Sequence, residues 1–265
     1  MKSIKTLYLG AGILGAIVLA AIFAPLITYF DPTEQDLVNT LGAPSAAHWL
    51  GTDALGRDVF TRLIYGARID LTIGLVAVML PFIVGVTLGL ITGWFGGKFD
   101  VFVMRIVDTV IAFPFYVLAI ALVFVFGPGV KSIIVAISLV GWVAYCRIVR
   151  ANVLVAKQQD YIHAAILTGL PTKRILLRHM LPNVVSQAIV FSMSDIVLSI
   201  LAIVSLGYLG LGVPIPTAEW GSMIQEGQPY ILQQWWIATI PGFMVVIVGF
   251  SLSLIGDGLV ARLER

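Results

Sequence analysis

Residues 161–183 read YIHAAILTGLPTKRILLRHMLPN, a polar stretch in a chain that is otherwise mostly apolar. Good helix formers run from Ala151 to Thr168, and Gly169 follows at a point where glycine commonly ends a helix in the left-handed conformation. Pro171 then stands near the start of a second short helix, where its missing N–H does no harm. The stretch therefore predicts two short, stiff helices at a fixed angle that project from the apolar part of the chain into water.

The second of these helices is expected from about Thr172 to Met180, and Pro182 is expected to end it before the next apolar segment. Its spacing brings apolar side chains together among basic ones, so part of its surface is apolar. From the residues alone, two interpretations stay open. One is an amphipathic helix that rests on lipid headgroups, and the other is a docking site for a soluble partner that accepts a helix in a groove.

The composition of the chain is typical of a membrane protein. Of its 265 residues, 59% are hydrophobic and only 11% are charged, whereas an average soluble domain carries about 25% charged residues. A surface with so few charges suits lipid rather than water. The single cysteine, Cys146, excludes an internal disulfide, and the three histidines show no metal-ligand spacing, so no metal site is expected.

Six segments are apolar enough to cross a membrane as helices of about 20 residues. The third holds Arg105 and Asp108 near its start, which are expected to form a local pair, and the fifth holds Asp195. The fourth is short, and basic residues are expected to mark its ends. The six segments are Leu7–Phe30, Leu71–Trp94, Val101–Phe126, the 15 residues between Lys131 and Arg147, Val184–Val213, and about Ile237–Gly256.

Lysine and arginine indicate the orientation, because cytoplasmic loops of membrane proteins carry an excess of them. With the N-terminus in the cytoplasm, the cytoplasmic segments hold twelve of these residues and the outside segments hold four. We therefore expect both termini and the stretch quoted above in the cytoplasm. The expected organisation is an N-terminal membrane helix at 1–30, an outside loop with a short helix at 31–70, and a core of five membrane helices at 71–265, with a cytoplasmic loop at 151–182 and an outside loop at 214–236.

The first outside loop contains the sequence HWLGTDALGRDVFTRLIYGARIDL at 48–71. Thr52 and Asp53 are expected to cap a short turn, and Asp58 to cap the following helix. Asp58 and Arg62 are spaced as a favourable ion pair on that helix. Around the second outside loop stand three tryptophans that suit either a membrane-interface belt or a docking surface, namely Trp220, Trp235 and Trp236.

Asp195 lies about twelve residues into the fifth apolar segment. An intramembrane carboxylate normally faces the interior of a helix bundle or a wet cavity, and it indicates a functional site by default. With Ser192 and Ser199 it would form a polar stripe that lines a translocation pathway. A structural hydrogen bond, or an ion pair with a partner subunit, explains the same residue equally well.

The sequence HAAILTGLPTKRILLRHMLP at 163–182 resembles the signature loop of ABC importer permeases. That pattern is Glu-Ala-Ala, three residues, Gly, and then about nine residues to an apolar-x-Leu-Pro ending. His163 stands where the general pattern has glutamate, and the ending at 178–183 resembles the peptide/nickel branch of the superfamily. The matching residues are Ala164, Ala165, Gly169, Leu181 and Pro182.

Two further motifs resemble the second permease subunit of peptide and nickel importers. They are Gly-Thr-Asp-x-x-Gly-Arg-Asp at 51–58 and LGYLGLGVPIPTAEWGSMIQEGQPYI at 206–231. The three motifs stand in the right order and together cover most of residues 48–257. The resemblance implies an all-α membrane protein with six transmembrane helices and a cytoplasmic coupling-helix loop between helices 4 and 5, the type I ABC importer permease fold.

The resemblance also implies roles for particular residues. The residues expected to couple the chain to an ATPase are Tyr161, His163, Ala164, Ala165, Gly169, Pro171, Arg174, Arg178, His179, Leu181 and Pro182. The residues expected to contact a periplasmic binding protein or to form a gate are Gly51, Thr52, Asp53, Gly56, Arg57, Asp58, Glu219, Trp220 and Gly221. The residues expected to line the pathway are Asp195, Ser192 and Ser199.

The expected function is that of a non-catalytic permease subunit in a bacterial inner membrane, forming half of a pathway for di- and oligopeptides. The chain has no GxxxxGK[ST] phosphate loop, so no cofactor is expected on it, and ATP and Mg²⁺ would be used by partner subunits. The expected partners are a homologous second permease, two ABC ATPases, a periplasmic binding protein and the lipid membrane. Import of nickel or another metal chelate is the alternative, and a proton-coupled secondary transporter that uses Asp195 is a further one.

Overall fold

The computed structural model describes residues 2–263, so residues 1, 264 and 265 of the expected terminal segments lie outside the described part. Over this range the chain is all helical, and its only β-type pairing is an isolated bridge between Thr52 and Asp58. The expected all-α class is confirmed. The helices are α1 (Lys2–Ile22), α2 (Ala24–Ile27), α3 (Val59–Phe95), α4 (Gly97–Ile111), α5 (Phe115–Phe126), α6 (Val130–Ala156), α7 (Asp160–Leu167), α8 (Thr172–Arg174), the π-helical η1 (Ile175–Met180), α9 (Leu181–Tyr208), α10 (Trp220–Gly227), the 3₁₀-helical η2 (Gln228–Tyr230) and α11 (Trp235–Leu263).

Five of these helical segments are long and apolar enough to cross a membrane, and α4 with α5 makes a sixth if the bent pair counts as one span. The two helices of that pair meet at 92°. The sequence predicts one apolar segment there, Val101–Phe126, and the structure divides it into two helices because Pro114 caps α5 and cannot continue α4. By contrast, Pro81 and Pro241 lie inside the long helices α3 and α11.

The boundaries of α3 and α6 also differ from those expected. Helix α3 begins at Val59 rather than near Leu71, so the first outside loop ends at Asp58 and its expected short helix is the first part of α3. Helix α6 runs past Arg147, which therefore does not mark its end. The expected segments stop at charged residues, Asp70 in α3 and Arg147 in α6, but both helices continue through them.

The chain enters α9 without a break, because α8, η1 and α9 form one continuous helical segment from Thr172 to Tyr208. The expected stop at Pro182 is therefore wrong. Proline falls in the first turn of α9, directly after the widened π turn, where the N–H that it lacks is not required. The expected helix from Ala151 to Thr168 is likewise divided, since α6 ends at Ala156 and α7 begins at Asp160.

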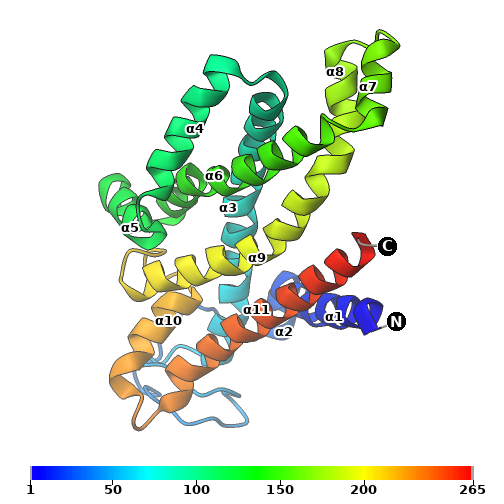
Figure 1. Cartoon of the computed structure of the whole chain (residues 1–265). Coiled ribbons are helices and arrows are strands. Elements are labelled where there is room, and N and C mark those ends of the chain that lie inside the picture. Colours follow the sequence, from blue (N-terminus) through cyan, green and yellow to red (C-terminus); the bar gives the residue numbers. More distant parts are fainter. Residues whose placement is uncertain (1, 264–265) are drawn as a thin grey trace.

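Helices α3 and α6 pack closely along a row of glycines on α3 (Figure 1). A Cβ atom at Gly89 would lie 2.6 Å from the carbonyl oxygen of Cys146, and one at Gly93 would lie 2.8 Å from Val153 Cβ. Glycine is therefore needed for the two backbones to approach. Helices α1 and α11 form a second pair beside this core, and α9 packs against both groups.

The molecule has two ends that matter for function (Figure 1). One end carries α7 and α8, and is called the α7 end below. The other carries α10 and the long connection between α2 and α3, residues 28–58, and is called the α10 end. The start of α1 and the end of α11 point away from α10.

Candidate functional site

The hairpin between α7 and α8 has the geometry that Gly169 and Pro171 predict. Gly169 adopts a φ of 72°, a left-handed conformation that side chains other than glycine rarely adopt. Its N–H donates to the carbonyl of Ile166 at 3.0 Å, which closes the end of α7. Pro171 precedes α8, and its carbonyl accepts from the N–H groups of Arg174 and Ile175. The turn is therefore short and fully bonded.

The hairpin is fixed to the membrane helices by its own apolar face. Ile162 of α7 and Met180 of η1 are both fully buried, in one cluster with Tyr145, Val149 and Val153 of α6. Displacement of the hairpin must therefore displace α6 and α9, because the interior of such a cluster is close-packed. A bidentate ion pair between Arg150 and Asp100, at 2.6 and 2.7 Å, also connects α6 to α4.

The opposite face of the hairpin is exposed and mixes basic with apolar side chains. Among the expected coupling residues, Ala165 is buried and His179 and Leu181 are partly buried. The exposed ones are Tyr161, His163, Ala164, Gly169, Pro171, Arg174, Arg178 and Pro182. Sequence reasoning missed Ile166, Leu167 and Leu177, of which Leu167 is 87% exposed. Their apolar side chains within an otherwise polar stretch were the signal from which this exposed surface could have been predicted.

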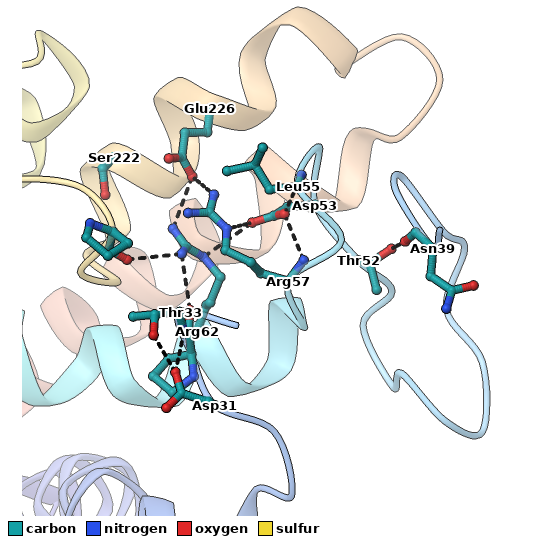
Figure 2. A network of polar contacts seen from close by, with 12 residues as sticks. Asp31, Thr33, Asn39, Thr52, Asp53, Leu55, Arg57, Arg62, Ser222 and Glu226 are labelled. Atoms are coloured by element: carbon teal, nitrogen blue, oxygen red, sulfur yellow. Dashed lines mark hydrogen bonds and ion pairs between the residues drawn. The ribbon is translucent and has the colours of Figure 1, made fainter. Parts of the chain in front are cut away.

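At the α10 end, Asp53 organises the loop before α3 (Figure 2). Its Oδ1 accepts from the N–H groups of Leu55 and Arg57, at 2.9 and 3.0 Å, which confirms the expected capped turn. Its Oδ2 accepts from Arg57 Nε at 2.7 Å. Thr52 donates to the carbonyl of Asn39 and accepts from the N–H of Gly42. These two bonds connect the last part of the loop to its middle.

Two buried arginines connect this loop to α10. Arg57 Nη2 lies 2.6 Å from Glu226 Oε2, and Arg62 Nη2 lies 3.0 Å from the same oxygen (Figure 2). Both arginine side chains are almost completely buried. Arg62 also donates to the carbonyls of Pro32 and Pro216, from the two loops on either side. The cluster therefore joins the first outside loop, the start of α3 and α10 into one unit.

Asp58 caps α3 as expected, since its Oδ2 accepts from the N–H of Thr61 at 2.7 Å. The expected ion pair between Asp58 and Arg62 is wrong. Asp58 Oδ1 instead contacts His48 Nδ1 at 2.9 Å, and Arg62 is bonded to Asp53 and Glu226. A capping side chain turns back over the first N–H groups, so it does not reach along the helix to the residue four positions later.

Glu219 and Asp70 form a second buried polar group at this end. Glu219 caps α10, because its two carboxylate oxygens accept from the N–H groups of Gly221 and Ser222, at 2.6 and 2.8 Å. Asp70 of α3 accepts from the N–H of Trp220 at 3.0 Å, and its carboxyl group lies close enough to Glu219 for the two to interact electrostatically. Burial raises the pKa of Glu219, and the two backbone N–H groups oppose that shift.

The residues expected to contact a binding protein are therefore interior residues. Thr52, Asp53, Arg57, Asp58, Glu219 and Trp220 are each at most 4% exposed, and Gly51, Gly56 and Gly221 are buried as well. In this structure their polar side chains and backbone groups bond to other parts of the same loops. Trp220 is likewise no interface anchor, since its ring is buried and its Nε1 donates to the carbonyl of Leu63 at 3.0 Å. Trp235, by contrast, is 56% exposed.

A cavity of about 490 Å³ lies between the α4–α5 bend, α6 and α9. Asp195 and Ser199 both line it, whereas Ser192 does not and donates to the carbonyl of Ile189 in its own helix. The hydroxyl of Tyr145 donates to Asp195 Oδ2 at 2.8 Å. The expected structural hydrogen bond and the expected position on a cavity are thus both present at Asp195. The expected pair of Arg105 with Asp108 is wrong, because Asp108 lies 3.9 Å from Arg147 of α6.

Comparison with known proteins identifies the family. Residues 85–265 match the model described as binding-protein-dependent transport system inner membrane component. The chain belongs to this family. Residues 2–44 also match the N-terminal TM domain of oligopeptide transport permease C. The resemblance noted in the sequence is therefore confirmed.

Individual relatives of the permease cover almost its whole length. It is 40% identical to the dipeptide transport system permease protein DppC of Alkalihalophilus pseudofirmus over 98% of this chain and 85% of that relative. It is 39% identical to the oligopeptide transport system permease protein OppC of Bacillus subtilis over 97% of this chain and 85% of that relative. An inward-facing structure of the MetNI methionine ABC transporter shares the fold, with a TM-score of 0.60 and 18% identity, over 77% of this chain and 97% of that one.

Proposed function

We propose that this permease forms half of the translocation pathway of an ATP-driven importer of di- and oligopeptides. A homologous second permease would form the other half. Two ABC ATPases would bind the α7 end and use ATP and Mg²⁺ there, and a periplasmic binding protein would deliver the peptide at the α10 end. The observation that carries the proposal is the family match over 85–265 together with relatives at about 40% identity that are named dipeptide and oligopeptide permeases.

The geometry of the α7 end supports the coupling part of the proposal. A stiff hairpin with an exposed apolar tip suits insertion into a groove, a common way to recognise a helix. Leu167, next to the turn, is an exposed apolar residue of the hairpin, and so is Leu177; Arg174 and Arg178 are exposed as well. Because the other face of the hairpin is packed into α6 and α9, a push on the tip would reach the membrane helices directly.

Exposed apolar residues at the α10 end support the docking part. Val38 is 91% exposed and Leu232 is 97% exposed. They lie on loops that the buried arginine cluster and the Glu219 cap hold in place. We propose that they contact the binding protein, in place of the buried residues that the sequence suggested. The proposed orientation puts the α7 end and both termini in the cytoplasm, in agreement with the distribution of lysine and arginine.

Two alternatives are less well supported. The names of the relatives speak for peptides rather than for nickel or another metal chelate. A proton-coupled transporter that relays protons through Asp195 would lose uptake when an uncoupler collapses the gradient while ATP is maintained. An ATP-driven importer would retain uptake under that condition.

Gentle purification of the tagged chain from its native membrane, followed by mass spectrometry, tests the proposal. We expect a second six-helix permease and one or two P-loop ATPases to co-purify. Reconstituted in vesicles with the binding protein, that complex is expected to accumulate a labelled dipeptide only when ATP is present. A chain that purifies alone or as a homodimer, and that transports in vesicles without ATP, would overturn the proposal.

A further inference from the structure

The cavity between the α4–α5 bend, α6 and α9 carries a single charged side chain. Its walls are mainly apolar and aromatic, with Phe113, Tyr116 and Phe191 among them. Asp195 is the only aspartate, glutamate, lysine or arginine among the fourteen lining residues. The cavity therefore presents one negative charge to whatever enters it, within a size range that is typical of small-molecule sites.

The charge of Asp195 has no cationic partner among the described residues. The carboxylate accepts one hydrogen bond, from the hydroxyl of Tyr145 at 2.8 Å. The ion pairs that residues 2–263 form all involve other carboxylates. Tyr145 itself is fully buried between Phe82 and Phe191, whose rings meet it edge-on at 5.4 and 5.1 Å. Its hydroxyl therefore holds the carboxylate in a fixed direction.

The position of this carboxylate is far from either end of its helix. Asp195 is the fifteenth of the 28 residues of α9, so it lies about 20 Å from each end at ~1.5 Å per residue. A carboxylate at such depth in a membrane helix is costly unless a cation or water accompanies it. The fold provides the space and one hydrogen bond, and leaves the cation to be supplied from outside the chain.

We propose that Asp195 binds the protonated amino terminus of a peptide as it passes through this cavity. The inference rests on the proposed function, from which it takes the peptide. An α-ammonium group is the cation that peptides with a free amino terminus share, whatever side chains they carry. The aromatic walls attract the same cation through their ring faces, and they accept apolar side chains of different shapes.

A single ion pair also suits transport, which requires that the peptide be released again after it has bound. The carboxylate is fixed by Tyr145 but makes no further polar contact within the described chain, so it offers one strong contact and no cage. A peptide held by one such contact leaves again when the cavity opens. Asp195 would therefore select for a free amino terminus without reading the peptide sequence.

Uptake by the complete importer tests the inference. The wild-type complex and the variant Asp195→Asn are reconstituted in vesicles with ATP inside, and with the binding protein and radiolabelled alanyl-alanine outside. Asparagine keeps the shape of the side chain and can still accept from Tyr145. We expect normal assembly and normal ATP hydrolysis, but uptake reduced about tenfold to hundredfold, the factor that one charge-assisted contact contributes.

Matched variants separate the charge from other effects. Asp195→Glu restores the charge and is expected to recover part of the uptake. Ser192→Ala, on the same helix but outside the cavity, is expected to transport like the wild type. Unchanged uptake by Asp195→Asn overturns the inference, and so does loss of the second permease from that variant, which would assign Asp195 to an ion pair between subunits.

A photo-crosslinking experiment locates the peptide directly. Photoleucyl-alanine carries its diazirine on the N-terminal residue and keeps its ammonium group free, whereas alanyl-photoleucine carries it on the C-terminal residue. We expect the first to label the α9 segment around Phe191 and Leu198, and to lose this labelling in Asp195→Asn. Equal labelling by both peptides overturns the inference but leaves the proposed function intact. Absence of ATP-dependent uptake in the wild type overturns the proposed function, and this inference with it.

Discussion

Asp70 and Glu219 are the residues on which the position of α10 depends most directly. The Asp70 carboxyl accepts from the N–H of Trp220 through Oδ2, and its buried Oδ1 accepts no hydrogen bond. Glu219 is fully buried next to it and caps α10. Two buried carboxyl groups beside each other cannot both carry a charge at low cost, so we predict that the pair shares one proton.

Asp70→Asn is therefore expected to keep the fold, because an amide supplies both the acceptor for Trp220 and a donor for Glu219. Asp70→Ala removes both and leaves the N–H of Trp220 unpaired, at a cost of about 1–3 kcal/mol in the free energy of unfolding. Thermal unfolding of the purified protein in detergent measures the difference. Equal unfolding temperatures for the two variants would contradict the shared proton.

The same pair predicts a pH dependence. Burial raises the pKa of Glu219 in the folded protein, so the stability that its proton supplies is present at low pH and is lost as the pH rises through that raised pKa. The unfolding temperature of the wild type is expected to fall over this range. Asp70→Asn supplies a permanent donor, so its unfolding temperature is expected to fall less.

Glu226 is the counterion of two buried arginines, Arg57 and Arg62. Glu226→Ala leaves two positive charges with only Asp53 beside them, and breaking a buried pair in this way costs about 3–5 kcal/mol. We expect a large decrease in the unfolding temperature and early proteolysis of the loop before α3. Glu34→Ala, which removes an exposed carboxylate at the same end, serves as the control and is expected to have no such effect.

At the scale of elements, the glycines of α3 determine how closely it packs against α6. A Cβ atom at Gly89 would lie 2.6 Å from a carbonyl oxygen of α6, which cannot move without breaking its helix. Gly89→Leu is therefore expected to separate the two helices and to lower the yield of folded protein in the membrane. Gly12→Leu in α1 is the control, because nothing lies within 4 Å of a Cβ atom at Gly12. Similar yields for the two variants would contradict the close packing.

The turn between α7 and α8 predicts a different kind of defect. Nothing lies within 4 Å of a Cβ atom at Gly169, so the constraint there is the backbone conformation alone. Gly169→Asn is expected to be tolerated, because asparagine adopts positive φ more readily than other residues. Gly169→Val is expected to insert normally but to hydrolyse ATP with uptake reduced about tenfold or more, since a β-branched residue strains the turn by roughly 1–2 kcal/mol. Comparing uptake per ATP hydrolysed in vesicles checks this, and equal ratios would count against a coupling role.

The sequence predicts the class of the elements better than their ends, for a reason visible in α3 and α6. Asp58 as the cap of α3 and Gly169 as the end of α7 follow from local chemistry, and both predictions are confirmed. The length of α6 does not follow from local chemistry: the expected segment stops before Arg147, whereas the helix continues past Arg147 and Arg150, and Arg150 pairs with Asp100, fifty positions earlier in the chain. The continuity of α3 across Asp70, after which the expected membrane segment begins, was hidden in the same way, because Asp70 accepts from the N–H of Trp220, 150 positions later.

The residues of the candidate site show the same difference between what local sequence predicts and what only the fold shows. The motif residues at 51–58 and 219–221 are conspicuous in the sequence because they build the loops, and the structure buries them. Among residues that reach the surface, Leu167 stands at an unspecified position of its motif and Leu232 follows a motif, so their exposure is visible only in the fold. A sequence pattern therefore marks where a loop is formed, and the folded structure is needed to show which side chains the loop presents.

At the scale of the whole molecule, the orientation can be measured with single cysteines. The only native cysteine, Cys146, is fully buried and should not react. In intact cells, Leu232→Cys at the α10 end is expected to react with a membrane-impermeant maleimide. Leu167→Cys at the α7 end is expected to react only after the membrane is opened. The reverse pattern would overturn the proposed orientation.

The arginine cluster at the α10 end also has a consequence for the order in which the protein is made. Arg57 and Arg62 meet Glu226 across 169 and 164 positions of the chain. At about 5–20 residues per second, a ribosome takes roughly 10–30 seconds to synthesise that interval. During this time Arg57 and Arg62 have been synthesised, but Glu226 has not, so Asp53 is the only carboxylate of the cluster present. An unfinished chain, in which α10 has not yet emerged, therefore differs from a finished one in that Arg57 and Arg62 do not pair with Glu226.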